Sequence, residues 1–87
     1  MTERLWLVER DYNDKGLIEL VYATPDGERV RRRARAPAAL QQRGAAVTAA
    51  IDVDADTLDS IDDPDLQNRY AKEATRMAEQ HDPDDAV

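Results

Sequence analysis

Arginines are concentrated in one short stretch of an otherwise acidic chain. Five of the ten arginines lie within residues 28–37, although the formal net charge is −7. In a β-strand, alternate side chains point to the same face and lie about 6.6 Å apart. This spacing predicts a row of four guanidinium groups on one face: Arg29, Arg31, Arg33 and Arg35. Together with Arg32 and Arg43 they form the candidate partner-binding site.

A row of guanidinium groups can bind phosphates or carboxylates, so several interpretations stay open. One is nucleic-acid binding and another is an acidic protein partner. A third is an edge strand whose charges block aggregation, and a fourth is internal pairing with carboxylates of the C-terminal half. The run has no interleaved aromatic residue and no RNP, KH or zinc-finger signature. We therefore favour a protein partner or self-association, with nucleic acid as the alternative.

The two halves of the chain differ in charge. Residues 1–45 carry nine basic and seven acidic side chains, whereas residues 46–87 carry three basic and twelve acidic ones. Such sorting of charge indicates either a charged partner or a match between the halves.

The acidic residues 52–63 begin like a calcium-binding loop, with carboxylates at relative positions 1, 3, 5 and 12. Thr57 stands where the loop needs glycine, and Asp63 is shorter than the usual bidentate glutamate. We therefore predict a solvated acidic loop and no metal site.

No constellation of residues typical of catalysis is present. The chain has no cysteine, and His81 is its only histidine. No glycine-rich phosphate loop or spaced nucleophile accompanies the carboxylates. We expect a structural role for His81, no cofactor, no small-molecule ligand and no enzymatic activity.

Three short strands must position the arginines. Residues 4–10 and 17–23 are rich in strand formers and are separated by a polar turn that ends in Gly16. Residues 24–27 read Thr-Pro-Asp-Gly, a strong turn signal, so the arginine run becomes the third strand of an antiparallel meander. Both faces of the first strand are apolar, which indicates a central strand or a dimer surface.

Short elements are predicted between the third strand and the C-terminal helix. Residues 38–42 are expected to form one or two helical turns and residues 47–53 a fourth strand. Asp54 is expected to cap a short turn or helix that extends to Ile61.

The clearest helix is predicted over residues 64–81. Asp63 suits its N-cap and Pro64 its first position, and Pro83 lies beyond its end. Its apolar stripe comprises Leu66, Tyr70, Ala74, Met77, Ala78 and His81. The fold class is therefore α+β: a three- to four-stranded antiparallel β-meander with a C-terminal amphipathic helix packed on the sheet.

Length and composition fit one domain over residues 1–81, followed by a flexible acidic tail over residues 82–87. The core must be small because fourteen of the apolar residues are alanine, and dimerisation would be one way to bury more surface. Charged residues come within the first four positions, so we expect no secretory signal there, and no apolar stretch is long enough to span a membrane. We expect a cytoplasmic protein without a membrane partner.

Abundant aspartate and alanine with only two lysines, the segment LIELVYATPDG at residues 17–27 and the acidic C-terminal end together resemble the small acidic uncharacterised proteins of halophilic archaea. This resemblance implies no activity and no site residues. It does imply that molar salt, with a Debye length of about 3 Å, screens the repulsion among carboxylates.

Overall fold

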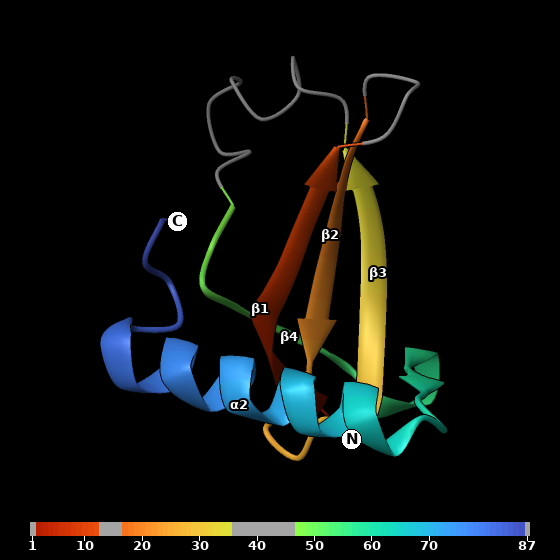
Figure 1. Cartoon of the computed structure of the whole chain (residues 1–87). Helices are drawn as coiled ribbons and strands as arrows, with labels where there is room; N and C mark the ends of the chain where they lie inside the picture. Colours follow the sequence, from red (N-terminus) through yellow and green to blue (C-terminus); the bar gives the residue numbers. More distant parts are fainter. Residues whose placement is uncertain (1, 13–16, 36–46, 87) are drawn as a thin grey trace.

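The computed structural model describes residues 2–12, 17–35 and 47–86, with the side chains of Tyr12 and Arg35 left out. It is an α+β fold of an antiparallel sheet and a C-terminal helix, as predicted (Figure 1). The sheet has five strands rather than three or four. The strands are β1 (Thr2–Tyr12), β2 (Ile18–Ala23), β3 (Arg29–Arg35), β4 (Ala50–Asp54) and β5 (Asp59–Ser60).

The strand order is β4-β1-β2-β3-β5, and every pairing is antiparallel. β1 is an inner strand, which explains why Leu5, Trp6 and Leu7 are all buried although they point to both faces. Its register with β2 shifts between Leu7 and Glu9, so Val8 is the extra residue of a β-bulge. The interpretation of β1 as a central strand is therefore confirmed.

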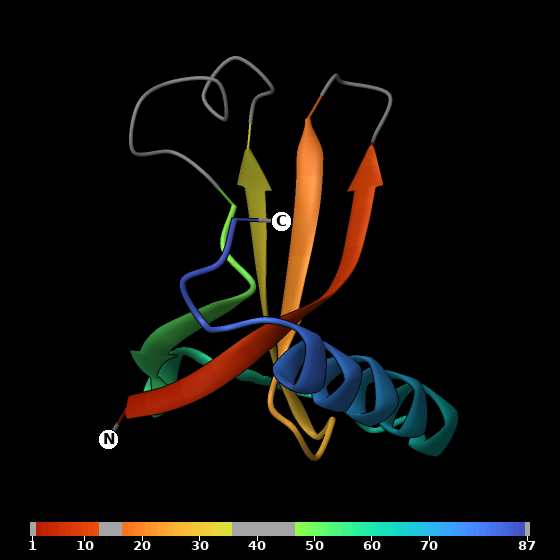
Figure 2. The ribbon, with the colours of Figure 1, turned by 90° about the vertical axis from the view of Figure 1, so that its left-hand side faces the viewer.

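The sheet is strongly curled, because its two edge strands are joined by a very short connection. Residues 55–58 link β4 to β5, and three of them form the 3-10 helix η1 (Ala55–Thr57). In a flat sheet the four strand spacings would separate these edges by about 19 Å. A connection that contains a 3-10 turn of about 2 Å rise per residue reaches only about 13 Å. Figure 2 shows the accompanying bend of β1 across the sheet.

The fifth strand corrects the prediction of a turn or helix reaching Ile61. Asp54 does cap η1, since its Oδ1 accepts a hydrogen bond from the Asp56 amide at 3.1 Å. The helix ends at Thr57, and Asp59 and Ser60 then pair with Val30 and Arg29. Both residues are polar and exposed, so no hydrophobic alternation marked them as a strand.

The helix α2 (Pro64–Gln80) matches its prediction closely. Asp63 is the N-cap and accepts a hydrogen bond from the Asp65 amide at 3.0 Å, and His81 is the C-cap. The helix crosses one face of the sheet and buries Tyr70, Ala74 and Met77 (Figures 1 and 2). Leu66 is only half-buried and Ala78 is exposed, so the buried stripe is narrower than predicted.

Apolar side chains are buried on both faces of the sheet. On the helix face, Tyr70 packs with Val21, Ala23, Val30 and Ile61. A larger cluster includes Ala74 and Met77 of the helix together with side chains of the opposite face, where Leu20 and Tyr22 are almost fully buried. Leu58 packs against this larger cluster from the connection between β4 and β5.

The turn between β2 and β3 fits directly beneath α2. Gly27 has a φ of 73°, a left-handed conformation that favours glycine. A Cβ at this position would meet the backbone carbonyl of Gln67 and would lie 2.8 Å from the backbone nitrogen of Ala71. The turn predicted from Thr-Pro-Asp-Gly thus also fixes how closely the helix approaches the sheet.

The C-terminal segment returns to the start of β4. The amides of Ala49 and Ala50 donate hydrogen bonds to the carbonyls of Asp85 and Pro83, at 2.8 and 3.0 Å. Thr48 forms an isolated bridge with Ala86. The flexibility predicted for residues 82–87 stays a prediction, and backbone partners are present for Asp82, Pro83, Asp85 and Ala86. The helical turns predicted at residues 38–42 lie outside the described residues.

Candidate binding edge on strand β3

The strand that carries the arginines lies near the margin of the sheet (Figure 1). β2 pairs with β3 along its whole length, from Ala23 opposite Val30 to Ile18 opposite Arg35. On the other side, β5 covers only Arg29 and Val30. Within the described part of the chain, no strand pairs with the outer side of β3 beyond Val30. We refer to residues 31–35 as the open edge.

The register confirms the predicted alternation of the arginines. Arg31 lies opposite Tyr22 and Arg33 opposite Leu20, so both belong to the face opposite the helix. Arg32 lies opposite Val21, on the helix face. Arg35 occupies the same register set as Arg31 and Arg33, but its side chain lies outside the described part, as does all of Arg43.

The arginines of the row are half-buried. The register neighbours of Arg31 and Arg33 on β2 are Tyr22 and Leu20, which are buried. Arg29, Arg31 and Arg33 are of intermediate exposure, whereas Arg32 is exposed. Arginine commonly lays its aliphatic stem on apolar surface and keeps its charge near water. The Nε of Arg31 is buried and has no hydrogen-bond partner. A buried donor without a partner costs about 1 to 3 kcal/mol, which an added acceptor would offset.

Only one arginine of the row has a carboxylate partner in the described structure. Arg29 Nη2 lies 3.2 Å from Glu3 Oε1, and Glu3 belongs to β1 rather than to the acidic half of the chain. Arg31, Arg32 and Arg33 form no ion pair with any described residue. One of the four interpretations was that this row pairs with carboxylates of the C-terminal half. Among the described residues, the row forms no such pair.

The two halves of the chain do form ion pairs, but at other places. Arg4 Nε lies 2.9 Å from Asp52 Oδ1, and Arg69 Nη2 lies 3.5 Å from Glu9 Oε1. The hydrogen bond from Arg4 lowers the pKa of Asp52, and the same contact raises the pKa of Arg4. Sequence alone could not assign these partners, because strand register and helix placement decide them.

On the helix face, Glu9 links β1 to α2. The Tyr70 hydroxyl donates a hydrogen bond to Glu9 Oε2 at 2.8 Å. Burial, followed by this hydrogen bond and the charge of Glu9, raises the pKa of Tyr70. The positive charges of Arg32 and Arg69 act in the other direction on this pKa. Arg32 therefore belongs to the face that holds Glu9, whereas Arg31 and Arg33 belong to the opposite face.

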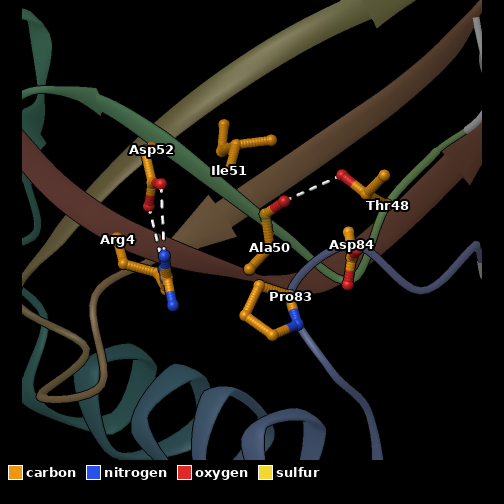
Figure 3. A pocket seen from close by; sticks show the side chains of 7 residues that line it. All are labelled: Arg4, Thr48, Ala50, Ile51, Asp52, Pro83 and Asp84. Atoms are coloured by element: carbon orange, nitrogen blue, oxygen red, sulfur yellow. Dashed lines mark hydrogen bonds and ion pairs between the residues drawn. The ribbon is translucent and has the colours of Figure 1, made fainter.

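A pocket of about 420 Å³ lies where the C-terminal segment meets β4 (Figure 3). Asp52 holds the guanidinium of Arg4 through two contacts, at 2.9 and 3.3 Å, on one side of this pocket. Thr48 donates a hydrogen bond to the Ala50 carbonyl at 2.8 Å, and Pro83 and Asp84 complete the lining. Arg4, the arginine among these lining residues, is thus neutralised by Asp52. The pocket is therefore less suited to bind an anion than the open edge is.

His81 Nδ1 lies 3.7 Å from Asp85 Oδ2, next to the segment that returns to β4. In residues 2–12, 17–35 and 47–86, no group of three histidine, aspartate or glutamate side chains is placed to hold a metal ion. Among the same residues, no helix is both long and apolar enough to cross a membrane.

Comparison with known proteins adds a family but no activity. No curated protein and no solved structure matches the chain. The model of a family of unknown function, DUF7967, matches residues 1–87, and the chain therefore belongs to this family.

Proposed function

We propose that this domain is a non-enzymatic binding module that captures an acidic segment of a protein partner on the open edge of β3. One observation carries the proposal. Arg31 and Arg33 lie on one face of β3, at its open edge, without a carboxylate partner in the described structure, while Arg4, Arg29 and Arg69 are paired. Partly buried cations without a counter-charge favour an anionic partner.

An acidic protein segment suits this surface better than nucleic acid does. The three aromatic side chains that the structure describes, Trp6, Tyr22 and Tyr70, are all buried and cannot stack on bases. The net charge of −7 would also repel a long polyanion, whereas a short acidic segment meets mainly the local field of the arginines. Nucleic acid is accordingly the competing outcome of the test below.

Self-association through two open edges is disfavoured. Pairing β3 with β3 of a second copy would bring arginines of the two chains opposite or diagonal to one another. Like charges at such positions destabilise a sheet. An edge with this composition discourages pairing with itself and accepts a strand of opposite charge.

The test is a titration of a fluorescent glutamate-rich peptide, followed by anisotropy. The double variant Arg31→Gln, Arg33→Gln should weaken binding by about tenfold or more. The matched control is Lys72→Gln, Arg76→Gln, which removes the same charge from the exposed side of α2 and should bind like the parent. Equal weakening by both variants would show a general charge effect and overturn the proposal. A fluorescent oligothymidylate that binds more tightly than the peptide would overturn it in favour of nucleic acid.

A further inference from the structure

The backbone of the open edge has hydrogen-bonding groups that point away from the sheet. The Thr24 amide donates to the Arg29 carbonyl at 3.0 Å, so the backbone of Arg29 faces β2. In an antiparallel pair this direction alternates, so Arg31 and Arg33 also face β2, and Arg32 and Ala34 face outward. Glu28, the residue before Arg29, faces outward, since its carbonyl accepts a hydrogen bond from the Ile61 amide at 2.9 Å. This bond agrees with the same alternation.

We propose that the acidic partner segment binds as an added antiparallel strand in line with β5, bonded to the outward amides and carbonyls of Arg32 and Ala34. This inference rests on the proposed function and specifies how the partner is recognised. β5 already occupies this line opposite Arg29 and Val30, so an added strand continues an existing ladder. Its C-terminal end lies where Leu58 leaves the ladder for η1.

The geometry also specifies the sequence pattern of the partner. Residues of the added strand opposite Arg33 and Arg35 form the non-hydrogen-bonded pairs, where Cα atoms are only about 4.5 Å apart, since Leu58 follows Asp59 at the place next to Arg31. An acidic side chain opposite Arg33 lies beside its guanidinium group and diagonal to Arg31, and it can supply the acceptor that Arg31 Nε lacks. The residues between such non-hydrogen-bonded positions place their amides toward β3. The expected pattern is therefore acidic residues at every second position, separated by neutral strand formers.

Methylation of single backbone amides in the peptide provides the sharpest test, because the protein itself is unchanged. In a peptide that alternates glutamate with threonine, the threonine amides point toward β3 and the glutamate amides point away. N-methylation of a central threonine should weaken binding by about tenfold, since it removes one ladder bond and adds bulk. N-methylation of a central glutamate should change affinity by less than about threefold.

A protein variant tests the same ladder from the other side. Ala34→Pro removes an outward amide at an edge position that tolerates proline, and it leaves every arginine in place. It should lose about tenfold in affinity for the alternating peptide. Ala34→Gly keeps the amide and controls for local loss of strand propensity. Circular dichroism checks that both variants keep the fold, and the methylated peptides decide the question if Ala34→Pro unfolds.

The outcomes separate this inference from the proposed function. If the peptide fails to bind the parent protein or is insensitive to Arg31→Gln, Arg33→Gln, the proposed function fails. If it binds through these arginines but methylation at either position has the same effect, the proposed function stands and strand addition is wrong. A peptide of the same composition with its glutamates in one block should bind more weakly than the alternating one. Equal binding of the two peptides would overturn the proposed pattern.

Discussion

Arg29 and Glu3 form a 3.2 Å ion pair between β3 and β1, two strands that do not pair with each other. The side chains are 40% and 32% exposed, so the pair is partly shielded from water. This contact distinguishes the members of the arginine row: Arg29 joins two strands of the fold, whereas Arg31 and Arg33 form no ion pair with any described residue.

Removing the Arg29–Glu3 pair should reduce stability modestly. Arg29→Gln and Glu3→Gln should each lower the free energy of unfolding by less than about 1 kcal/mol, and the double variant should show a favourable coupling of similar size. Urea denaturation followed by the fluorescence of Trp6, the single buried tryptophan, measures these values. The double variant Arg31→Gln, Arg33→Gln should unfold like the parent, and a large loss of stability there would show a structural role for these residues.

Gly27→Ala should be one of the most destabilising single changes in the chain. Alanine is strained at a φ of 73°, and its Cβ would collide with the backbone of α2 at Gln67 and Ala71. We expect a loss of about 2 kcal/mol or more in the free energy of unfolding. The neighbouring change Glu28→Ala, at an exposed position, is the control and should cost little. Similar stability of both variants would contradict the close approach of the turn to the helix.

Asp26 should make the stability depend on pH in the acid range. The Thr24 hydroxyl donates to its Oδ1 at 2.5 Å and the Glu28 amide at 2.9 Å, and both bonds lower the pKa of Asp26 below 3.8. A lowered pKa stabilises the fold above the unfolded value, and this contribution disappears as the pH falls through the folded value. Asp26→Asn should therefore be less stable than the parent at neutral pH, and the gap should narrow below pH 3.8. Thermal melts at several pH values measure this difference in stability. A difference that stays constant as the pH falls would show that the two hydrogen bonds do not depend on the charge of Asp26.

The helix should depend more on Met77 than on Leu66. Met77 is 9% exposed and joins the larger core cluster, whereas Leu66 is half-buried beside Tyr70. Met77→Ala should cost about 2 to 5 kcal/mol, and Leu66→Ala should cost clearly less. Ala78→Ser, on the exposed side of the same helix, is the control. Urea denaturation measures both losses of stability. A larger loss for Leu66→Ala than for Met77→Ala would contradict the side of the helix that faces the sheet.

The elements that follow from local sequence were predictable, and those that depend on distant partners were not. Alternation in β2, the Thr-Pro-Asp-Gly turn and the Asp63-Pro64 cap are local, so their positions in the structure agree with expectation to within one or two residues. β5 is two polar residues that become a strand only beside Arg29 and Val30. The bulge at Val8 likewise exists only in relation to β2.

The same distinction applies to the candidate site. The face shared by Arg31 and Arg33 follows from the period of a strand, so it could be predicted from spacing alone. The partner of Arg29 is a residue 26 positions away in the chain, and its choice depends on the curl of the sheet. The difference between Arg29 and its neighbours was therefore invisible before the fold was known.

The short connection between β4 and β5 has a mechanical consequence. Because residues 55–58 tether opposite margins of the sheet, neither margin can peel away without pulling on the other. Opening of the sheet at one edge strand therefore requires movement of the other. Among the described residues, the tethered strand β5 covers only Arg29 and Val30 of β3.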